Sequence, residues 1–300
     1  MSFVDNTTTL WTGTDAQGFY SKALLTGESK SKIKLFPNVK SKIKIPRFDM
    51  SGLLQAADCT FTDAGTSTLS EKTLTVCPLK INIEICQRTF ENDYLSMQLK
   101  AGSNGIETAP KSIEDYIFGQ IAANVSFETE ALLWNGDTGT PGDLCEGLIP
   151  LMQNDTVVLT VAGTTITASN VFAEIAKVYA LIPDTIINKG KVVIFVSNTV
   201  AKSYRSAIAA INPLGGSYNN GDYRLYYLGV ELIIAPGMTA NQMVAAEPDN
   251  LFFGTDLISD FEDVMLIPQK GLSGAPTARF VAEFKFGVQY GVSEEIVLYA

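Results

Sequence analysis

The chain has 300 residues, a formal net charge of −10 at pH 7 and no histidine. Apolar residues make up 46% and charged residues 18% of the sequence, a balance that is typical of a packed globular protein and too apolar for a disordered one. Because histidine is absent, the sequence excludes His-dependent nucleophilic triads, His-ligated metal sites and imidazole acid–base chemistry. An enzyme is therefore disfavoured from the outset.

The charge is unevenly distributed along the chain. Residues 1–50 hold eight basic and four acidic side chains, whereas the remaining 250 residues carry a formal charge of −14. An acidic body repels nucleic acid, so sequence-specific DNA binding is disfavoured. The first residues do not resemble a secretory signal, and the longest uncharged stretch, about 156–173, is too polar for a membrane span. We expect a soluble protein made in a reducing cytosol.

The N-terminal segment, residues 1 to about 29, alternates small polar residues and glycine with scattered aromatic side chains and shows no sustained period. Such a segment cannot bury its own apolar groups, so Trp11 and Phe19 need a surface that something else supplies. We interpret the segment as an arm. A disordered N-terminus is the alternative.

A short repeat follows, because Lys-Ser-Lys-Ile-Lys occurs at residues 30–34 and again at 40–44. Lysines alternate with aliphatic residues in each copy, which is the pattern of a half-buried strand, and Pro37-Asn38 between the copies favours a turn. The pattern predicts a lysine-faced hairpin or a pair of edge strands. The lysines either protect a sheet edge from unwanted pairing or meet acidic neighbours.

Residues 56–86 predict a long two-stranded excursion, with limbs at 57–63 and 73–86 around a tip rich in glycine, serine and threonine. This arrangement places Cys59 opposite Cys77, where a disulfide is conceivable. Free cysteines are the expectation for a cytosolic protein. A hairpin of this length is marginal by itself, so it requires a partner surface.

The strongest helix pattern of the chain begins after a short helix expected at about residues 89–99. Ser112 is a plausible N-cap, and isoleucine or valine recurs every four residues from Ile113 to Val125. The pattern continues to Asn135, which gives about 24 residues and a length of about 36 Å. A helix this long, preceded by a long hairpin, indicates an extended molecule.

The rest of the chain alternates strand and helix patterns and then returns to strands. The pattern predicts a compact α/β body over residues 151–265, and no phosphate-binding glycine motif occurs in it. The expected strands are 157–161, 191–196, 230–235, 279–290 and 295–299, and the expected helices are 169–181 and 199–211.

The order of these elements resembles the major capsid protein of tailed bacteriophages, which has the Hong Kong 97 fold. The most specific likeness is the end of the long helix, Phe127-Glu-Thr-Glu-Ala-Leu-Leu-Trp-Asn-Gly-Asp137. A second likeness is Gly229-Val-Glu-Leu-Ile-Ile-Ala-Pro236, followed by Asn250-Leu-Phe-Phe-Gly-Thr-Asp256. The resemblance spans nearly the whole chain, although its motifs are short.

This resemblance implies an α+β fold of four parts. The parts are an N-terminal arm at 1–40, an extended β-hairpin loop at 41–88, a peripheral domain at 89–150 and 265–300 with a spine helix at 112–135, and an α/β axial domain at 151–264. It implies a structural subunit without catalytic residues, cofactor or metal. Hexamers and pentamers of this subunit would form an icosahedral shell around double-stranded DNA in the virion, after synthesis in the host bacterial cytoplasm. A separate scaffolding protein and a portal are implied partners, and a membrane is not.

The arm and the extended loop are expected to bury their apolar residues on neighbouring subunits, and the basic segment is expected to meet the acidic body of another copy. The side chains expected at these intersubunit contacts are Trp11, Phe19, Lys30, Lys32, Lys34, Lys40, Lys42, Lys44 and Arg47. Two alternatives remain. One is an encapsulin-like nanocompartment shell with the same fold, and the other is a cytosolic α/β enzyme or ligand-binding domain.

Overall fold

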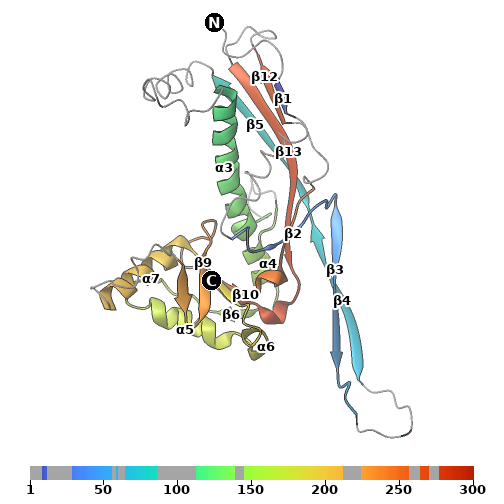
Figure 1. Ribbon diagram of the computed structural model, residues 1–300, viewed down its shortest axis with the longest axis vertical. Coiled ribbons are helices and arrows are strands. Elements are labelled where there is room, and N and C mark those ends of the chain that lie inside the picture. The colour runs from blue at the N-terminus through green and yellow to red at the C-terminus, as the bar shows by residue number, and fades with distance from the viewer. Residues whose placement is uncertain are drawn as a thin grey trace, which may run out of the picture.

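The computed structural model describes residues 9–11, 29–55, 59, 65–86, 113–138, 145–211, 224–256, 264–269 and 277–300. The fold is α+β and elongated (Figure 1). An α/β body lies at one side, an upright region is built on one long helix and one long strand, and a two-stranded hairpin extends away from both.

The upright region is organised around helix α3, Ile113–Asn135, and strand β13, Thr277–Tyr290. Strand β5, Cys77–Cys86, pairs antiparallel with β13 along its full length of 10 residues. Strand β12, Val264–Pro268, pairs with β13 as well, and β1, Thr9–Trp11, adds to β12. The predicted long helix and the predicted strand over 279–290 are therefore confirmed as elements.

The C-terminal end of β13 has one further neighbour, which continues the sheet. Strand β11, Leu251–Gly254, pairs antiparallel with it, and β2, Lys34–Phe36, pairs in parallel with β11. Alternate side chains of β13 are buried, among them Phe280, Phe284 and Phe286. This alternation is the one that the sequence pattern predicted.

The α/β body is a six-stranded sheet with the order β6-β14-β10-β7-β9-β8. Its strands are β6 (Leu159–Val161), β7 (Val193–Val196), β8 (Leu225–Tyr227), β9 (Val230–Ile234), β10 (Met243–Ala246) and β14 (Val297–Tyr299). The helices are α4 (Leu148–Asn154), α5 (Val171–Leu181), α6 (Asp184–Ile187) and α7 (Asn198–Ile211), with 3-10 turns at Pro248–Asn250 and Ser293–Glu295.

The central strand β7 supplies side chains to two cores, one on each face of the sheet. Ile194 and Val196 belong to the core formed with α5 and α7. Val193 and Phe195 belong to the core that contains the end of α3, where the rings of Trp134 and Phe195 lie 5.0 Å apart. Because both faces are covered, the strand is apolar throughout, as its sequence predicted. The long helix is thereby docked on the α/β body.

The projecting hairpin consists of β3, Lys42–Ser51, and β4, Thr66–Thr75. The two strands pair antiparallel along their full length and form a separate two-stranded sheet. The predicted limbs at 57–63 and 73–86 are therefore wrong. Period-two alternation continues from β4 into β5, but the pairing partner changes from β3 to β13 at Val76, and alternation alone does not reveal such a change.

Two other predictions have different outcomes. The lysine repeats do not pair with each other, so the hairpin alternative is wrong: the first leads into β2, which joins β11, whereas the second begins β3, which joins β4. Among the described strands, β2 and β3 each lie at a sheet edge, as the second alternative predicted, although only Lys34 of the first repeat belongs to the strand. Such pairings between distant segments have no local signature. The helix predicted at 89–99 lies outside the described residues.

The close packing of α3 on the α/β body leads to a prediction about Gly237. A Cβ atom added there would lie 2.1 Å from the backbone oxygen of Glu130 in α3. We expect Gly237→Ala to lower the free energy of unfolding by about 1–3 kcal/mol, because the helix or the turn must move. Urea denaturation followed by circular dichroism measures this change.

The matched control lies in the same helix. Gly119 of α3 is exposed, and nothing lies within 4 Å of the Cβ atom that an alanine would add. Gly119→Ala should stabilise the protein by about 0.5–1 kcal/mol, because alanine is the better helix former. Wild-type stability of Gly237→Ala would contradict the close approach of α3 to the body.

Candidate assembly surface

The hairpin β3–β4 has two faces, because successive side chains of a strand point to opposite sides. One face carries Ile43, Ile45 and Leu74 near the root, which is the end of the hairpin where Lys42 pairs with Thr75. Leu74 is fully buried and forms a small core with Val76 and Phe252. Farther from the root, this face carries only serine, threonine, Arg47 and Asp49 side chains. It therefore attaches the root to the subunit and has no apolar side chain to bury beyond that point.

The opposite face has the reverse order. Near the root it carries Lys42 and Lys44, whereas farther out it carries Phe48, Met50 and Leu69. These three side chains, which we call the distal apolar patch, are 57%, 54% and 71% exposed. Phe48 and Leu69 lie directly opposite each other in the ladder, so their side chains are neighbours. An apolar cluster on a projecting hairpin marks an interaction surface.

The apolar surface continues past the end of β3. Leu53 is 58% exposed and Leu54 is 99% exposed. Together with the distal apolar patch they place five large apolar side chains on the projecting hairpin without cover from the described residues. The subunit therefore leaves this surface available to another molecule.

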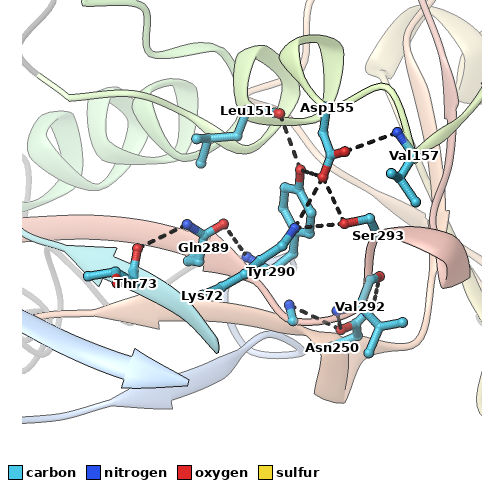
Figure 2. A network of polar contacts seen from close by, with 11 residues as sticks. Lys72, Thr73, Leu151, Asp155, Val157, Asn250, Gln289, Tyr290, Val292 and Ser293 are labelled. Atoms are coloured by element: carbon cyan, nitrogen blue, oxygen red, sulfur yellow. Dashed lines mark hydrogen bonds and ion pairs between the residues drawn. The ribbon is translucent and has the colours of Figure 1, made fainter. Parts of the chain in front are cut away.

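The hairpin root is held by a polar network (Figure 2). The Asp155 carboxylate accepts hydrogen bonds from the Ser293 hydroxyl at 2.7 Å, the Tyr290 hydroxyl at 2.9 Å and the Val157 amide at 3.0 Å. Lys72 of β4 completes the set, with its ammonium 3.2 Å from Asp155 and 3.6 Å from the centre of the Tyr290 ring. One lysine thus fastens the hairpin to the end of β13 and to the segment after α4.

The network shifts the pKa values of its members. Burial raises the pKa of Asp155, but the hydrogen bonds from Ser293, Val157, Tyr290 and Lys72 outweigh burial and hold this pKa well below its usual range. Burial also lowers the pKa of Lys72 and raises that of Tyr290, whose hydroxyl donates to Asp155. Asp155 therefore stays ionised in moderately acidic solution.

A pH dependence follows from the lowered pKa of Asp155. The stability that its carboxylate supplies is fully present above the unfolded-state pKa of about 4 and is lost as the pH falls from there toward the lower folded-state value. We expect Asp155→Asn to cost about 1–3 kcal/mol at pH 7 and to flatten the loss of stability below pH 4. Urea denaturation between neutral and acidic pH measures both effects.

Glu231→Gln is the control for this experiment. Its carboxylate pairs with the partly exposed Lys32 at 3.7 Å, so its removal should change stability by less than about 1 kcal/mol. An acid profile of Asp155→Asn that matches the wild type would contradict the proposed part of Asp155 in holding the root.

The aromatic residues predicted at intersubunit contacts lie in the N-terminal segment. Trp11 belongs to β1, where it pairs with Val264 of β12. Phe19 lies outside the described residues. Their contacts with other subunits stay a prediction.

Lys30 is buried within the subunit, in contrast to the prediction that it contacts a neighbour. Its ammonium donates to the Thr129 hydroxyl at 2.6 Å and to the Ser126 carbonyl at 3.0 Å, and it lies 3.9 Å from the Glu130 carboxylate. Burial lowers the pKa of Lys30 to about 8, and Glu130 opposes this shift. We withdraw Lys30 from the intersubunit set. The alternation in the repeat was misleading because the chain at Lys30 is a turn and not a strand.

The other basic residues of the set lie at the surface, and several have partners in the same subunit. Lys32 pairs with Glu231, Lys44 with Glu71, and Arg47 with Glu294 at 2.9 Å. The Lys34 ammonium lies 5.7 Å from the ring centre of Phe252. The further surface lysines are Lys40 and Lys42. Exposed ion pairs are weak, so these charges remain able to respond to a neighbouring subunit.

The cysteines pair differently from the expectation. Cys77, at the start of β5, forms a disulfide with Cys145, and Cys59 and Cys86 are free and exposed. Cys59 does not face Cys77, because the hairpin limbs are β3 and β4 and not the segments that were predicted. Sequence reasoning also missed Asp155, Lys72 and Tyr290, since their mutual contacts join residues between 83 and 218 positions apart.

Other kinds of site receive no support from the described residues. Within the described ranges, no group of three or more Cys, Asp or Glu side chains is arranged to hold a metal ion. In that same part of the chain, no helix combines the length and the apolar character that crossing a membrane requires.

The arrangement of elements is shared with capsid chains of known structure. A chain from the capsid of an empty GTA particle has a TM-score of 0.56 and 14% sequence identity, over 93% of this chain and 89% of that chain. A chain from the procapsid of satellite phage P4 has a TM-score of 0.59 and 11% identity, over 94% and 96%. A chain of Mycobacterium phage Ogopogo has a TM-score of 0.58 and 11% identity, over 91% of each.

The likeness includes a virus-like particle from Pyrococcus furiosus, with a TM-score of 0.53 and 10% identity over 95% of this chain and 96% of that chain. No protein-family model and no curated protein sequence matches this chain. Because the structural matches cover nearly all of both chains, the protein has the Hong Kong 97-type capsid fold that its element order predicted. At these identities the comparisons establish the fold alone.

Proposed function

We propose that this chain is the major shell subunit of a tailed-bacteriophage capsid and has a structural, non-catalytic function. Hexamers and pentamers of the subunit form an icosahedral shell around double-stranded DNA in the virion. The observation that carries the proposal is the distal apolar patch, Phe48, Met50 and Leu69, on a hairpin that projects from the subunit. The fold shared with capsid chains supports it.

The geometry of the patch favours rings over simple dimers. The patch lies on a projecting element and can dock on a different surface of the neighbouring copy. Such a head-to-tail contact between unlike surfaces repeats from copy to copy and closes into a ring when the rotation permits. Hexamers and pentamers are closed rings of this kind.

The charge of the chain fits a container for DNA. A net charge of −10 leaves the protein without a general attraction for phosphate, so packaged DNA can move along the shell without sequence-specific contact. A separate scaffolding protein and a portal are the further partners that we propose. Their place rests on the resemblance to tailed-phage capsids.

A nanocompartment shell is the second candidate, and the likeness to the virus-like particle from Pyrococcus furiosus favours it. The contents of purified particles discriminate the two: double-stranded DNA supports the phage shell, and a protein cargo supports the nanocompartment. No observation on the described residues favours the alternative of a cytosolic α/β enzyme.

Polar replacement of the distal apolar patch tests the assembly proposal. We expect the double variant Phe48→Ser/Leu69→Ser to fold normally, because both side chains are exposed in the subunit, but to lose about 2–4 kcal/mol per contact on assembly. The protein concentration needed for particles should rise at least about tenfold. Electron microscopy and sedimentation velocity measure particle formation.

Thr68→Ala is the matched control for this variant. Thr68 is exposed on the same strand but points to the opposite face, so this change should leave assembly unaltered. Particles of the double variant at the wild-type concentration would contradict the proposed function of the patch.

Salt tests the charge-pairing part of the proposal. If the exposed lysines meet acidic surfaces of neighbouring copies, raising the ionic strength from about 0.1 M to about 1 M shortens the screening length from about 10 Å to about 3 Å and weakens assembly. Lys42→Gln should reduce this salt dependence, because Lys42 is exposed and forms no ion pair with another described residue. Light scattering during assembly measures the effect, and a salt-independent yield would contradict charge pairing.

A further inference from the structure

A disulfide joins the root of the hairpin to the end of the long helix. Cys77 begins β5 immediately after Val76, where the hairpin ends, and Cys145 lies between α3 and α4. Their Cα atoms are 6.1 Å apart, within the range that a disulfide spans. The two cysteines are separated by 68 positions in the sequence, so the bond closes a large loop that contains β5 and α3.

Both ends of this bond lie in segments that backbone hydrogen bonds already hold. The Val76 amide donates to the Ser41 carbonyl at 3.0 Å, where the two hairpin strands meet the body. The Gly147 amide donates to the Gly136 carbonyl at 2.6 Å, which closes the loop of Cys145 against the end of α3. These contacts hold each segment in place, and both sulfur atoms lie close to the Phe286 carbonyl oxygen of β13, at 3.2 Å and 3.7 Å. The contacts with β13 therefore keep the two cysteines together while they are thiols. They leave the hairpin root and the helix without a covalent link.

A surface cavity gives small molecules access to the pair. It has a volume of about 250 Å³ and is lined by both cysteines and by polar side chains of β4 and β13. Cys145 is only 3% exposed, whereas Cys77 is partly exposed. A reagent that enters the cavity therefore reaches Cys77 first. The cavity opens at the surface, so the reactive end of a small thiol or disulfide can approach the Cys77 sulfur.

We propose that Cys77 and Cys145 form a thiol–disulfide exchange site for low-molecular-weight disulfides and thiols, and that their bond latches the hairpin root to the end of α3. The hairpin root and the end of α3 have no covalent link when both cysteines are thiols, as in a reducing cytosol. The disulfide joins these two segments after transfer to an oxidising medium. This inference goes beyond the shell function and does not depend on it.

The exchange has two balanced steps. The Cys77 thiolate attacks one sulfur of a small disulfide such as oxidised glutathione, so that a mixed disulfide forms and one small thiolate leaves. The Cys145 thiolate then attacks the Cys77 sulfur, which forms the protein disulfide and releases the second small thiolate. Two protein thiols have lost two protons and two electrons, and the small disulfide has become two thiols. An excess of small thiol reverses both steps.

The first test measures which cysteines react. Purified full-length subunit is equilibrated with oxidised or reduced glutathione, quenched by alkylation and analysed by mass spectrometry of its peptides. We expect Cys77 linked to Cys145 under oxidising conditions and both alkylated under reducing conditions. The exposed Cys59 and Cys86 are internal controls and should remain outside any link between cysteines of the same chain.

Variants with one cysteine replaced distinguish the functions of the two sulfur atoms. In Cys145→Ser, Cys77 should accumulate as the mixed disulfide with glutathione, because the resolving thiol is absent. In Cys77→Ser, glutathione should modify Cys145 at least about tenfold more slowly, because Cys145 is buried. Equal rates in the two variants would overturn the assignment of Cys77 as the point of entry.

The latch itself is tested by thermal unfolding. The oxidised wild type should melt roughly 10 °C above the reduced wild type, because the bond restricts a long loop of the unfolded chain. Cys145→Ser should remove this difference, and Cys59→Ser and Cys86→Ser should keep it. No link between Cys77 and Cys145, or the same melting temperature in both redox states, would overturn the inference. Each measurement uses unassembled subunits, so failure of shell assembly does not affect its outcome.

Discussion

Among the described strands, β3 and β4 of the hairpin pair only with each other, and the other features of the structure depend on this constraint. A two-stranded ribbon is marginal in water unless one of its faces is buried. At the root that face is covered, since Leu74 is buried against Phe252. Farther out the apolar side chains change to the other face, where no described residue of the subunit covers them. One copy of the subunit therefore buries the apolar side chains at the hairpin root and leaves those farther out exposed.

Several contacts hold the root so that the exposed half projects in a defined direction. Lys72 binds Asp155 after α4 and lies over the Tyr290 ring at the end of β13 (Figure 2). The disulfide between Cys77 and Cys145 joins the hairpin root to the segment that follows α3. The end of α3 is fixed in turn, because Trp134 packs on Phe195 in the sheet of the body. A patch that is presented by a rigid frame loses little conformational entropy on binding, so more of its apolar contact contributes to affinity.

Local periodicity predicted the elements whose partners are close in sequence or whose faces are uniform. The helix ending at Asn135 and the strand ending at Tyr290 have strong single-face patterns, and both were confirmed. The hairpin limbs were wrong because alternation runs unbroken through Val76, where the partner strand changes. The burial of Lys30, the anchor at Asp155 and the partner of Cys145 depend on residues far apart in the chain. No local pattern of charge or hydrophobicity encodes those contacts.

The central claim is that another copy completes the hairpin, and hydrogen–deuterium exchange tests it most directly. Backbone amides of β3 and β4 beyond the root should exchange rapidly in the free subunit, where the ribbon is solvated on both faces. In assembled particles the same amides should exchange at least about tenfold more slowly, while β7 in the body remains protected in both states. Equal exchange of β3 and β4 in free and assembled protein would contradict the account.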